Sequence, residues 1–199
     1  MSYVQTMRVL VVVPAQLGRP FLSEALESLS RQTRRADEII VAIGQTPLHE
    51  RLNDAIDASD CDAFIVLCDD DLLEPTYIEK TVARMVETGA NIVYTDLRHF
   101  GTRDAVWIAP PPDAPPDPNP LPVTSLCRKS VWAMVGGYRL GPYFDWAFWW
   151  SAINVGATRA KVAEPLFLYR NHLGQASLTL EQESINECEA IIRQRHQKQ

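Results

Sequence analysis

The sequence predicts an α/β fold in which a mostly parallel sheet is flanked by helices. The first observation is a series of short apolar runs, such as MRVLVVV at residues 7–13, that lack the apolar–polar alternation of half-buried strands. Such runs are typical of strands buried on both faces of a parallel sheet. The second observation is that segments with helical periodicity separate these runs. Alternation of this kind implies right-handed crossovers, with helices covering both faces of the sheet.

The first 95 residues predict the order strand, helix, strand, helix, strand, helix, strand. We expect Pro14 to end the first strand and Pro20 to take the first position of the following helix, where its fixed φ fits. Ligands of such sheets bind at the carboxyl ends of the strands, so the loops after the first and third strands are the candidate site. The predicted strands are 7–13, 37–43, 63–67 and 91–95, and the predicted helices are 20–32, 48–58 and 75–88.

The second half of the chain begins with a segment, residues 109–122, that holds eight prolines in 14 positions. This composition excludes a helix or a central strand. Two interpretations stay open, a surface connector and a lid over the site. Beyond it we expect strands at 123–127, 158–163 and 166–169, and helices at 129–135, 145–155 and 180–194.

Length and charge limit the class of protein. The chain has 199 residues, which fits one domain of residues 1–199, and a net charge of −6. The acidic balance argues against a general nucleic-acid coat or a polybasic membrane binder. The four cysteines fit neither a zinc site nor a disulfide framework, and no apolar run is long enough to cross a membrane. A reduced, cytoplasmic protein without a signal peptide or transmembrane segment is the simplest expectation.

Three consecutive carboxylates, Asp69, Asp70 and Asp71, follow the third predicted strand. Adjacent carboxylates repel one another unless a cation or hydrogen-bond donors offset the repulsion. Mg²⁺ or Mn²⁺ suits them, because these ions bind one or two carboxylates together with phosphate oxygens. The alternative is a solvated acidic turn that caps the following helix. The sequence lacks the GxGxxG, GxxxxGK[ST] and GxSxG patterns, which argues against dinucleotide oxidoreductases, P-loop NTPases and α/β-hydrolases.

Five segments in order then resemble family 2 glycosyltransferases, which have the GT-A (Rossmann-like) fold. The first is VVVPAQLGRPFLSEALESLSRQTRRADEIIVA, at residues 11–42. The second is VLCDDDLLEP, at residues 66–75, which is similar to the DXD motif loop of that family. The others are Gly136-Gly137-Tyr138, Phe144-Asp145-Trp146 and Tyr169-Arg170-Asn171-His172, and the resemblance covers about residues 7–176.

The resemblance implies a role for each matched residue. Residues 1–100 would bind the nucleotide-sugar and residues 101–199 the acceptor. Asp145 would be the catalytic base, and Asp69, Asp71 and His172 would hold Mn²⁺ or Mg²⁺, with Asp71 the most direct ligand. The nucleotide-sugar would contact Pro14, Ala15, Asp69 and Asp70, together with Arg51 and Asn53 from Arg51-Leu52-Asn53, which resembles the family's Arg/Asn stretch. Gln45 would contact it through amide hydrogen bonds in place of the family's acidic residue. The acceptor and donor sugar would contact Gly136, Gly137, Tyr138 and Trp146.

Several of these residues also have a simpler interpretation. Asp145 could be only the N-cap of the next helix, and Arg51 only a charge on a helix surface. His172 could be an ordinary loop histidine. Trp146 belongs to a stripe with Trp149, Trp150 and Ile153 that is more often core than sugar platform.

The resemblance implies a metal-dependent transferase that moves a sugar from a nucleoside-diphosphate sugar, with a UDP-sugar favoured, to a hydroxyl with inversion. The chemistry fits, because a metal stabilises the leaving diphosphate and one carboxylate accepts the proton of the acceptor. The family's acidic residues after the second strand are absent, since Gly44-Gln45-Thr46 stands there. A non-catalytic binder of nucleotide-sugars or of a partner, and a nucleotidyltransferase, are the alternatives. The acceptor class, whether glycan, lipid-linked glycan, protein, small molecule or modified nucleic-acid base, stays open.

Overall fold

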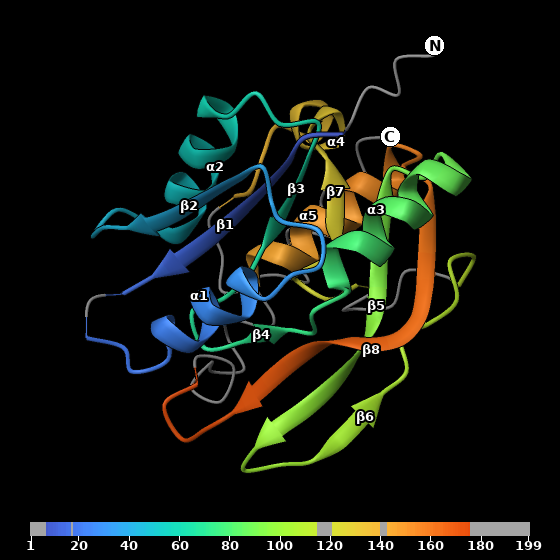
Figure 1. Ribbon diagram of the computed structural model, residues 1–199. Helices are drawn as coiled ribbons and strands as arrows, with labels where there is room; N and C mark the ends of the chain where they lie inside the picture. Colours follow the sequence, from blue (N-terminus) through green and yellow to red (C-terminus); the bar gives the residue numbers. More distant parts are fainter. Residues whose placement is uncertain (1–6, 17, 115–120, 140–142, 176–199) are drawn as a thin grey trace.

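The computed structural model describes residues 7–16, 18–114, 121–139 and 143–175, and its described strands form one sheet (Figure 1). The strand order is β2-β1-β3-β7-β5-β8-β4, and β6 pairs with β5. The strands are β1 (Val9–Ala15), β2 (Glu38–Ile43), β3 (Ala63–Val66), β4 (Leu72–Leu73), β5 (Ile92–Gly101), β6 (Ala105–Trp107), β7 (Leu126–Arg128) and β8 (Arg159–Asn171).

The direction of the strands confirms the predicted fold class. β1 is parallel to β2 and to β3, and β5 is parallel to β8. β7 lies between β3 and β5 and is antiparallel to both, so β3 and β5 also point the same way. Five strands therefore share one direction, and only the short β4, β6 and β7 oppose it.

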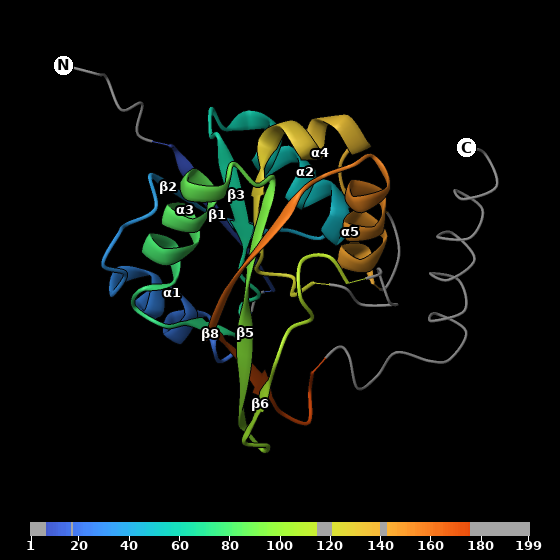
Figure 2. The ribbon, with the colours of Figure 1, turned by 90° about the vertical axis from the view of Figure 1, so that its right-hand side faces the viewer.

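Helices cover both faces of the sheet because β1 and β3 are apolar on both faces. Every residue of these two strands is buried. Figure 2 shows α1 and α3 on one side of the sheet and α2, α4 and α5 on the other, and each set packs on its own apolar cluster. The helices are α1 (Leu22–Ser30), α2 (Leu48–Ala58), α3 (Tyr77–Thr88), α4 (Lys129–Val135) and α5 (Phe144–Asn154).

Two prolines do not act as predicted. Pro14 does not end the first strand but pairs with Ala42 inside β1. β3 ends at Val66, and the Leu67 amide already donates to the Val12 carbonyl, so no strand bond on that side needs an N–H from Pro14. Pro20 precedes α1, which begins at Leu22 with Phe21 as its N-cap residue.

The β5–β8 pair is longer than the sequence predicts. β5 continues to Gly101 instead of ending at residue 95, and the two expected strands at 158–163 and 166–169 form one strand, β8. The pairing register shifts on both sides of Asp96, where Pro165 is its partner. This irregularity interrupts the apolar pattern and makes one bent strand look like two in the sequence. The sequence analysis also missed the short strands β4 and β6.

The Pro-rich segment is fixed at its described beginning. Prolines have no N–H group to donate, so the backbone of a proline can only accept hydrogen bonds, through its carbonyl group. Side chains from β5 and β8 donate to carbonyl groups of the segment. Lys161 Nζ donates to Ala109 O at 2.6 Å, Tyr94 to Pro110 O at 2.7 Å and Arg159 to Ala114 O at 2.9 Å. Residues 115–120, on which the lid interpretation depends, and the predicted helix at 180–194 lie outside the described residues.

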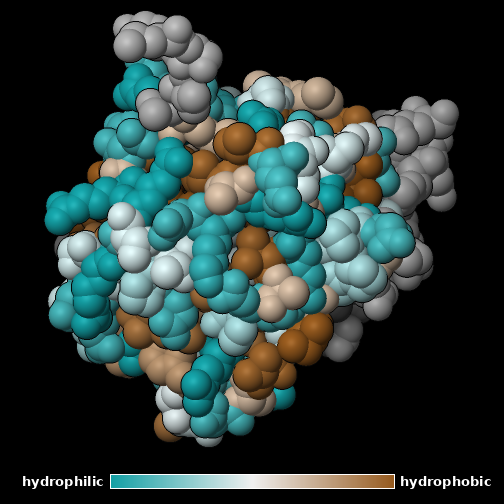
Figure 3. All heavy atoms as spheres, turned by 45° about the vertical axis from the view of Figure 1, so that its right-hand side comes forward, coloured by the Kyte–Doolittle hydropathy of each residue, from teal (hydrophilic) through white to brown (hydrophobic). Residues whose placement is uncertain are grey.

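The outer surface agrees with the composition. On the face drawn in Figure 3, hydrophilic residues surround smaller apolar patches. None of the described helices is long and apolar enough to cross a membrane. Cys61, Cys68 and Cys127, the cysteines within the described ranges, are free.

Candidate active site

A cavity of about 510 Å³ opens at the carboxyl ends of β1 and β3. Its volume lies within the range of small-molecule sites. The loops after both strands line it, as expected for an α/β sheet. Among the residues proposed from the sequence, those that line the cavity are Pro14, Ala15, Arg51, Asp69, Asp70, Asp71, Asp145 and Trp146.

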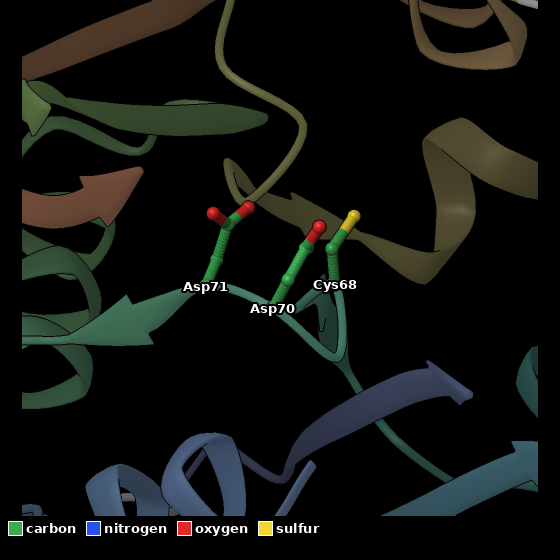
Figure 4. A group of neighbouring side chains, drawn as sticks. All are labelled: Cys68, Asp70 and Asp71. Atoms are coloured by element: carbon green, nitrogen blue, oxygen red, sulfur yellow. The ribbon is translucent and has the colours of Figure 1, made fainter. Parts of the chain in front are cut away.

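The acidic loop, residues 68–71, connects β3 to β4. Figure 4 shows the Cys68, Asp70 and Asp71 side chains pointing to the same side of this loop. One ligand atom from each of the three lies within 4.8 Å of the others. The group differs from the expected set of Asp69, Asp71 and His172, because Cys68 and Asp70 take the places of Asp69 and His172.

Arg170 on β8 holds the acidic loop. The backbone amide of Arg170 donates to Asp71 Oδ1 at 2.8 Å, and its guanidinium Nε donates to the Asp70 carbonyl at 2.7 Å. The same guanidinium pairs with Glu24 and lies between the rings of Phe21 and Phe100, 4.1 and 4.5 Å from their centroids. Arg170 therefore fixes the position of the acidic loop by hydrogen bonds to Asp70 and Asp71. The sequence analysis did not assign this role to Arg170.

His172 contacts Asp70 as well. Its Nε2 lies 3.1 Å from Asp70 Oδ2, while its Nδ1 accepts the Gly174 amide at 3.2 Å. Since Nδ1 is an acceptor, the proton lies on Nε2 and points to Asp70. In this tautomer His172 is a hydrogen-bond donor to the acidic loop rather than an ordinary loop histidine, and its role as a metal ligand stays a prediction.

The carboxylates of the loop carry an electrostatic cost. Burial and the neighbouring Asp70 charge raise the pKa of Asp71 well above its usual range, and Asp71 is only 2% exposed. Burial also raises the pKa of Asp69, whose Oδ2 accepts the Gln16 amide at 3.2 Å. A bound divalent cation would offset this cost, and carboxylate oxygens are the donors that Mg²⁺ and Mn²⁺ prefer. The loop therefore fits a hard cation better than a solvated acidic turn.

Asp145 lies in the first turn of α5, on the same cavity. Burial raises its pKa from 3.8 to about 6, although the N–H groups of Asp145 and Trp146 partly counteract this. The N-cap residue of α5 is Tyr143, so Asp145 is not the N-cap that the simpler interpretation expected. Its carboxylate is thus placed to change protonation near neutral pH.

Arg51 joins the ends of the first two strands. Its Nη1 donates to Ala15 O at 3.0 Å and to Ala42 O at 2.5 Å, and its Nε donates to Thr46 O at 3.1 Å. It is therefore not a simple surface charge, because it shapes the β1 and β2 ends while lining the cavity.

Other predicted residues lie outside the cavity lining. Asn53 is engaged in a structural joint: its Oδ1 accepts the Trp132 indole and the Tyr138 amide, and its Nδ2 donates to Tyr138 O. Gly137 has φ +75°, and a Cβ there would lie 2.6 Å from Asn53 Oδ1, so this glycine permits the close approach. The predicted residues outside the lining are Gln45, Asn53, Gly136, Gly137, Tyr138 and His172.

Aromatic residues complete the lining of the cavity, and Trp146 is the one among them that the sequence analysis proposed as a site residue. Trp146 stacks on Tyr143 at 4.2 Å, whereas Trp149 from the same stripe is fully buried in the core. The stripe is therefore divided between cavity and core. Trp107, His99 and Tyr169 also line the cavity, and only Tyr169 lay in a segment with a sequence signal.

The sequence matches no family model and no curated protein. Solved structures share its fold. S. aureus TarS 1–349 in complex with UDP-GlcNAc matches 94% of this chain and 65% of that chain, with a TM-score of 0.77 and 11% identity. A longer S. aureus TarS structure matches 96% of this chain and 43% of that chain, with a TM-score of 0.69 and 13% identity.

A mannosyltransferase, PcManGT from Pyrobaculum calidifontis in complex with GDP-Man and Mn²⁺, has a TM-score of 0.62 at 13% identity. The match covers 81% of this chain and 56% of that chain. The chain spans less than two thirds of the length of each of these three structures. At such identities the likeness concerns the fold alone: the chain has a GT-A-like glycosyltransferase fold.

Proposed function

We propose that this protein is a metal-dependent glycosyltransferase that moves a sugar from a nucleoside-diphosphate sugar to an acceptor hydroxyl with inversion. The observation that carries the proposal is that the acidic loop and Asp145 line one cavity at the carboxyl ends of the strands. The fold of the nucleotide-sugar-bound structures supports it. A UDP-sugar is the donor to test first, because TarS matches with UDP-GlcNAc bound.

Asp70 and Asp71 would hold the divalent metal, with Cys68 nearby. The metal supplies Lewis-acid stabilisation of the negative charge on the departing diphosphate. Arg170 and His172 keep the two carboxylates in place by the hydrogen bonds described above. Pro14, Ala15 and Arg51 would border the nucleotide at the ends of β1 and β2.

Asp145 would accept the proton of the acceptor hydroxyl. The acceptor oxygen forms a bond to the anomeric carbon as the bond to the nucleoside diphosphate breaks, and the proton moves to the Asp145 carboxylate. A single displacement needs only one such carboxylate and inverts the anomeric carbon. A pKa of about 6 makes Asp145 a stronger base than an ordinary carboxylate while leaving it mostly ionised at neutral pH.

The experiment combines a donor panel with one variant. Purified protein is incubated with UDP-, GDP-, CMP- and dTDP-sugars and hydroxyl acceptors, with Mn²⁺ or with chelator, and both the released nucleotide and the glycoside are measured. Asp145→Asn should fold and bind donor normally but transfer sugar about 100-fold more slowly or worse. The exposed Asp54→Asn on α2 is the matched control and should keep full activity.

Donor binding without transfer to any acceptor would instead indicate a non-catalytic binder. Transfer at the wild-type rate by Asp145→Asn would remove Asp145 as the base.

A further inference from the structure

The β6–β5–β8 part of the sheet presents one continuous side to the cavity. Leu97 on β5 pairs with Trp107 on β6 and with Phe167 on β8, and two residues further along β5 His99 pairs with Tyr169. Directly paired residues, and residues two apart in a strand, point to the same face of a sheet. All five line the cavity, and we name them the aromatic floor.

Ring contacts join three of the five residues, and Trp107 is connected to them through its pairing with Leu97. His99 and Tyr169 meet edge to face with centroids 5.4 Å apart, and Phe167 meets Tyr169 at 5.9 Å. The stacked pair of Tyr143 and Trp146 lines the same cavity from α5, next in sequence to Asp145. The floor and the α5 pair thus place aromatic rings on the same cavity as the candidate base, with Phe167 the buried member at 1% exposure.

The charges around the floor select against an anionic ligand. In the described part of the lining, the cationic side chains are Arg19 and Arg51, which lie after β1 and on α2, and Arg51 is committed to backbone carbonyls. Burial lowers the pKa of His99, so the floor's own titratable group is neutral at neutral pH. Asp145 lies outside the proposed metal group, so its carboxylate charge is not offset there, and it would repel a phosphate or carboxylate on the acceptor. Nucleic acid, which needs phosphate-binding cations, fits this side poorly.

We propose that the aromatic floor is the acceptor subsite and that it takes a neutral sugar ring, whose C–H face lies on Trp107. A pyranose combines an apolar C–H face, which suits a flat aromatic ring, with hydroxyls at its edge, one of which can reach Asp145. The inference rests on the proposed function and extends it from an unspecified hydroxyl to an uncharged saccharide.

The test separates acceptor binding from donor chemistry. Binding of methyl glucoside, methyl mannoside and methyl N-acetylglucosaminide is followed by saturation-transfer NMR in the presence of UDP and Mn²⁺, with glycerol phosphate as the anionic probe. Hydrolysis of the UDP-sugar without acceptor reports the donor side independently. Trp107→Ala should raise the KM or Kd for the neutral glycoside about tenfold, Trp107→Phe should restore most of it, and donor hydrolysis should stay unchanged.

Val106→Ala is the matched control, because Val106 is the neighbouring residue, points to the opposite face of β6 and is 53% exposed. It should change neither readout. Preference for glycerol phosphate over every neutral glycoside, or unchanged glycoside affinity in a folded Trp107→Ala, would overturn the subsite while leaving the proposed function intact. If the wild-type protein neither binds nor hydrolyses the UDP-sugar, the proposed function is overturned, and this inference with it.

Discussion

The acidic loop and Asp145 bring carboxylates to one cavity, but the protein holds them in different ways. Asp70 and Asp71 are fixed by Arg170 and His172, which lie about 100 residues away in sequence. Asp145 depends on burial and on N–H groups of its own helix start. The contrast indicates that the loop is built to keep a fixed shape, whereas Asp145 is placed for its protonation behaviour.

The largest expected effect is at the loop. Asp71→Asn keeps the acceptor of the Arg170 amide but removes the charge, so metal-dependent binding of the nucleoside diphosphate should weaken by about 100-fold or more. Titration calorimetry with UDP, with Mn²⁺ and with chelator, measures the change. Asp104→Asn, at an exposed residue paired with Arg98, is the control. Equal affinity of Asp71→Asn and wild type in Mn²⁺ would remove Asp71 from the metal site.

The next effect concerns the pH dependence of stability and is expected at Asp145. Raising its pKa from 3.8 to about 6 costs the ionised folded state about 3 kcal/mol at most. Because the folded-state pKa lies above the unfolded-state value of 3.8, the free energy of unfolding of the wild type falls as the pH rises from 3.8 through about 6. Below pH 3.8 the carboxyl group is protonated in both states and none of this free energy is lost. Asp145→Asn should therefore increase the free energy of unfolding near neutral pH, and the gain should vanish in acid.

Urea unfolding of both proteins across this pH range measures the gain. The exposed Asp54→Asn should show no such pH-dependent gain. A destabilised Asp145→Asn at neutral pH would show that the carboxylate is held by favourable contacts, and the comparison with the loop would fail.

The smallest of the three effects is at Arg170. Arg170→Lys keeps the charge and the backbone amide that bonds Asp71, but loses the planar group between Phe21 and Phe100 and the Nε bond to Asp70 O. We expect about tenfold weaker Mn²⁺ affinity, the effect typical of a residue that orients a metal ligand. Mn²⁺ binding by electron paramagnetic resonance tests this without an activity assay. An unchanged affinity would mean that β8 does not position the loop.

The fold was predictable where local signals are strong. The runs at β1 and β3 are apolar throughout, which predicts that helices cover both faces of the sheet. The segments of helical periodicity between the strands gave the alternation of strands and helices up to residue 95. The order of β7, β5 and β8 was not predictable, because it depends on pairings between distant segments. Pro165 at the irregular pairing with Asp96 hid the continuity of β8.

The candidate site shows the same limit. The acidic triplet and Asp145 stood out as charges in apolar surroundings, and both line the cavity. Their roles remain predictions. Asn53 was placed at the nucleotide by resemblance, but the structure uses its amide to join α2 to the segment after α4. The aromatic floor escaped notice because its five residues come together only through strand register.

The contacts between the acidic loop and β8 also bear on the order of folding. β4, which directly follows the loop, pairs with Leu168 and Phe167. Closing a chain segment of about 100 residues costs entropy and slows folding relative to local pairings such as β1 with β2. The acidic loop should therefore reach its final geometry only after β8 docks, which is expected late in refolding. In this protein, the last part of the described chain to fold would be the part that makes the first half competent to bind metal.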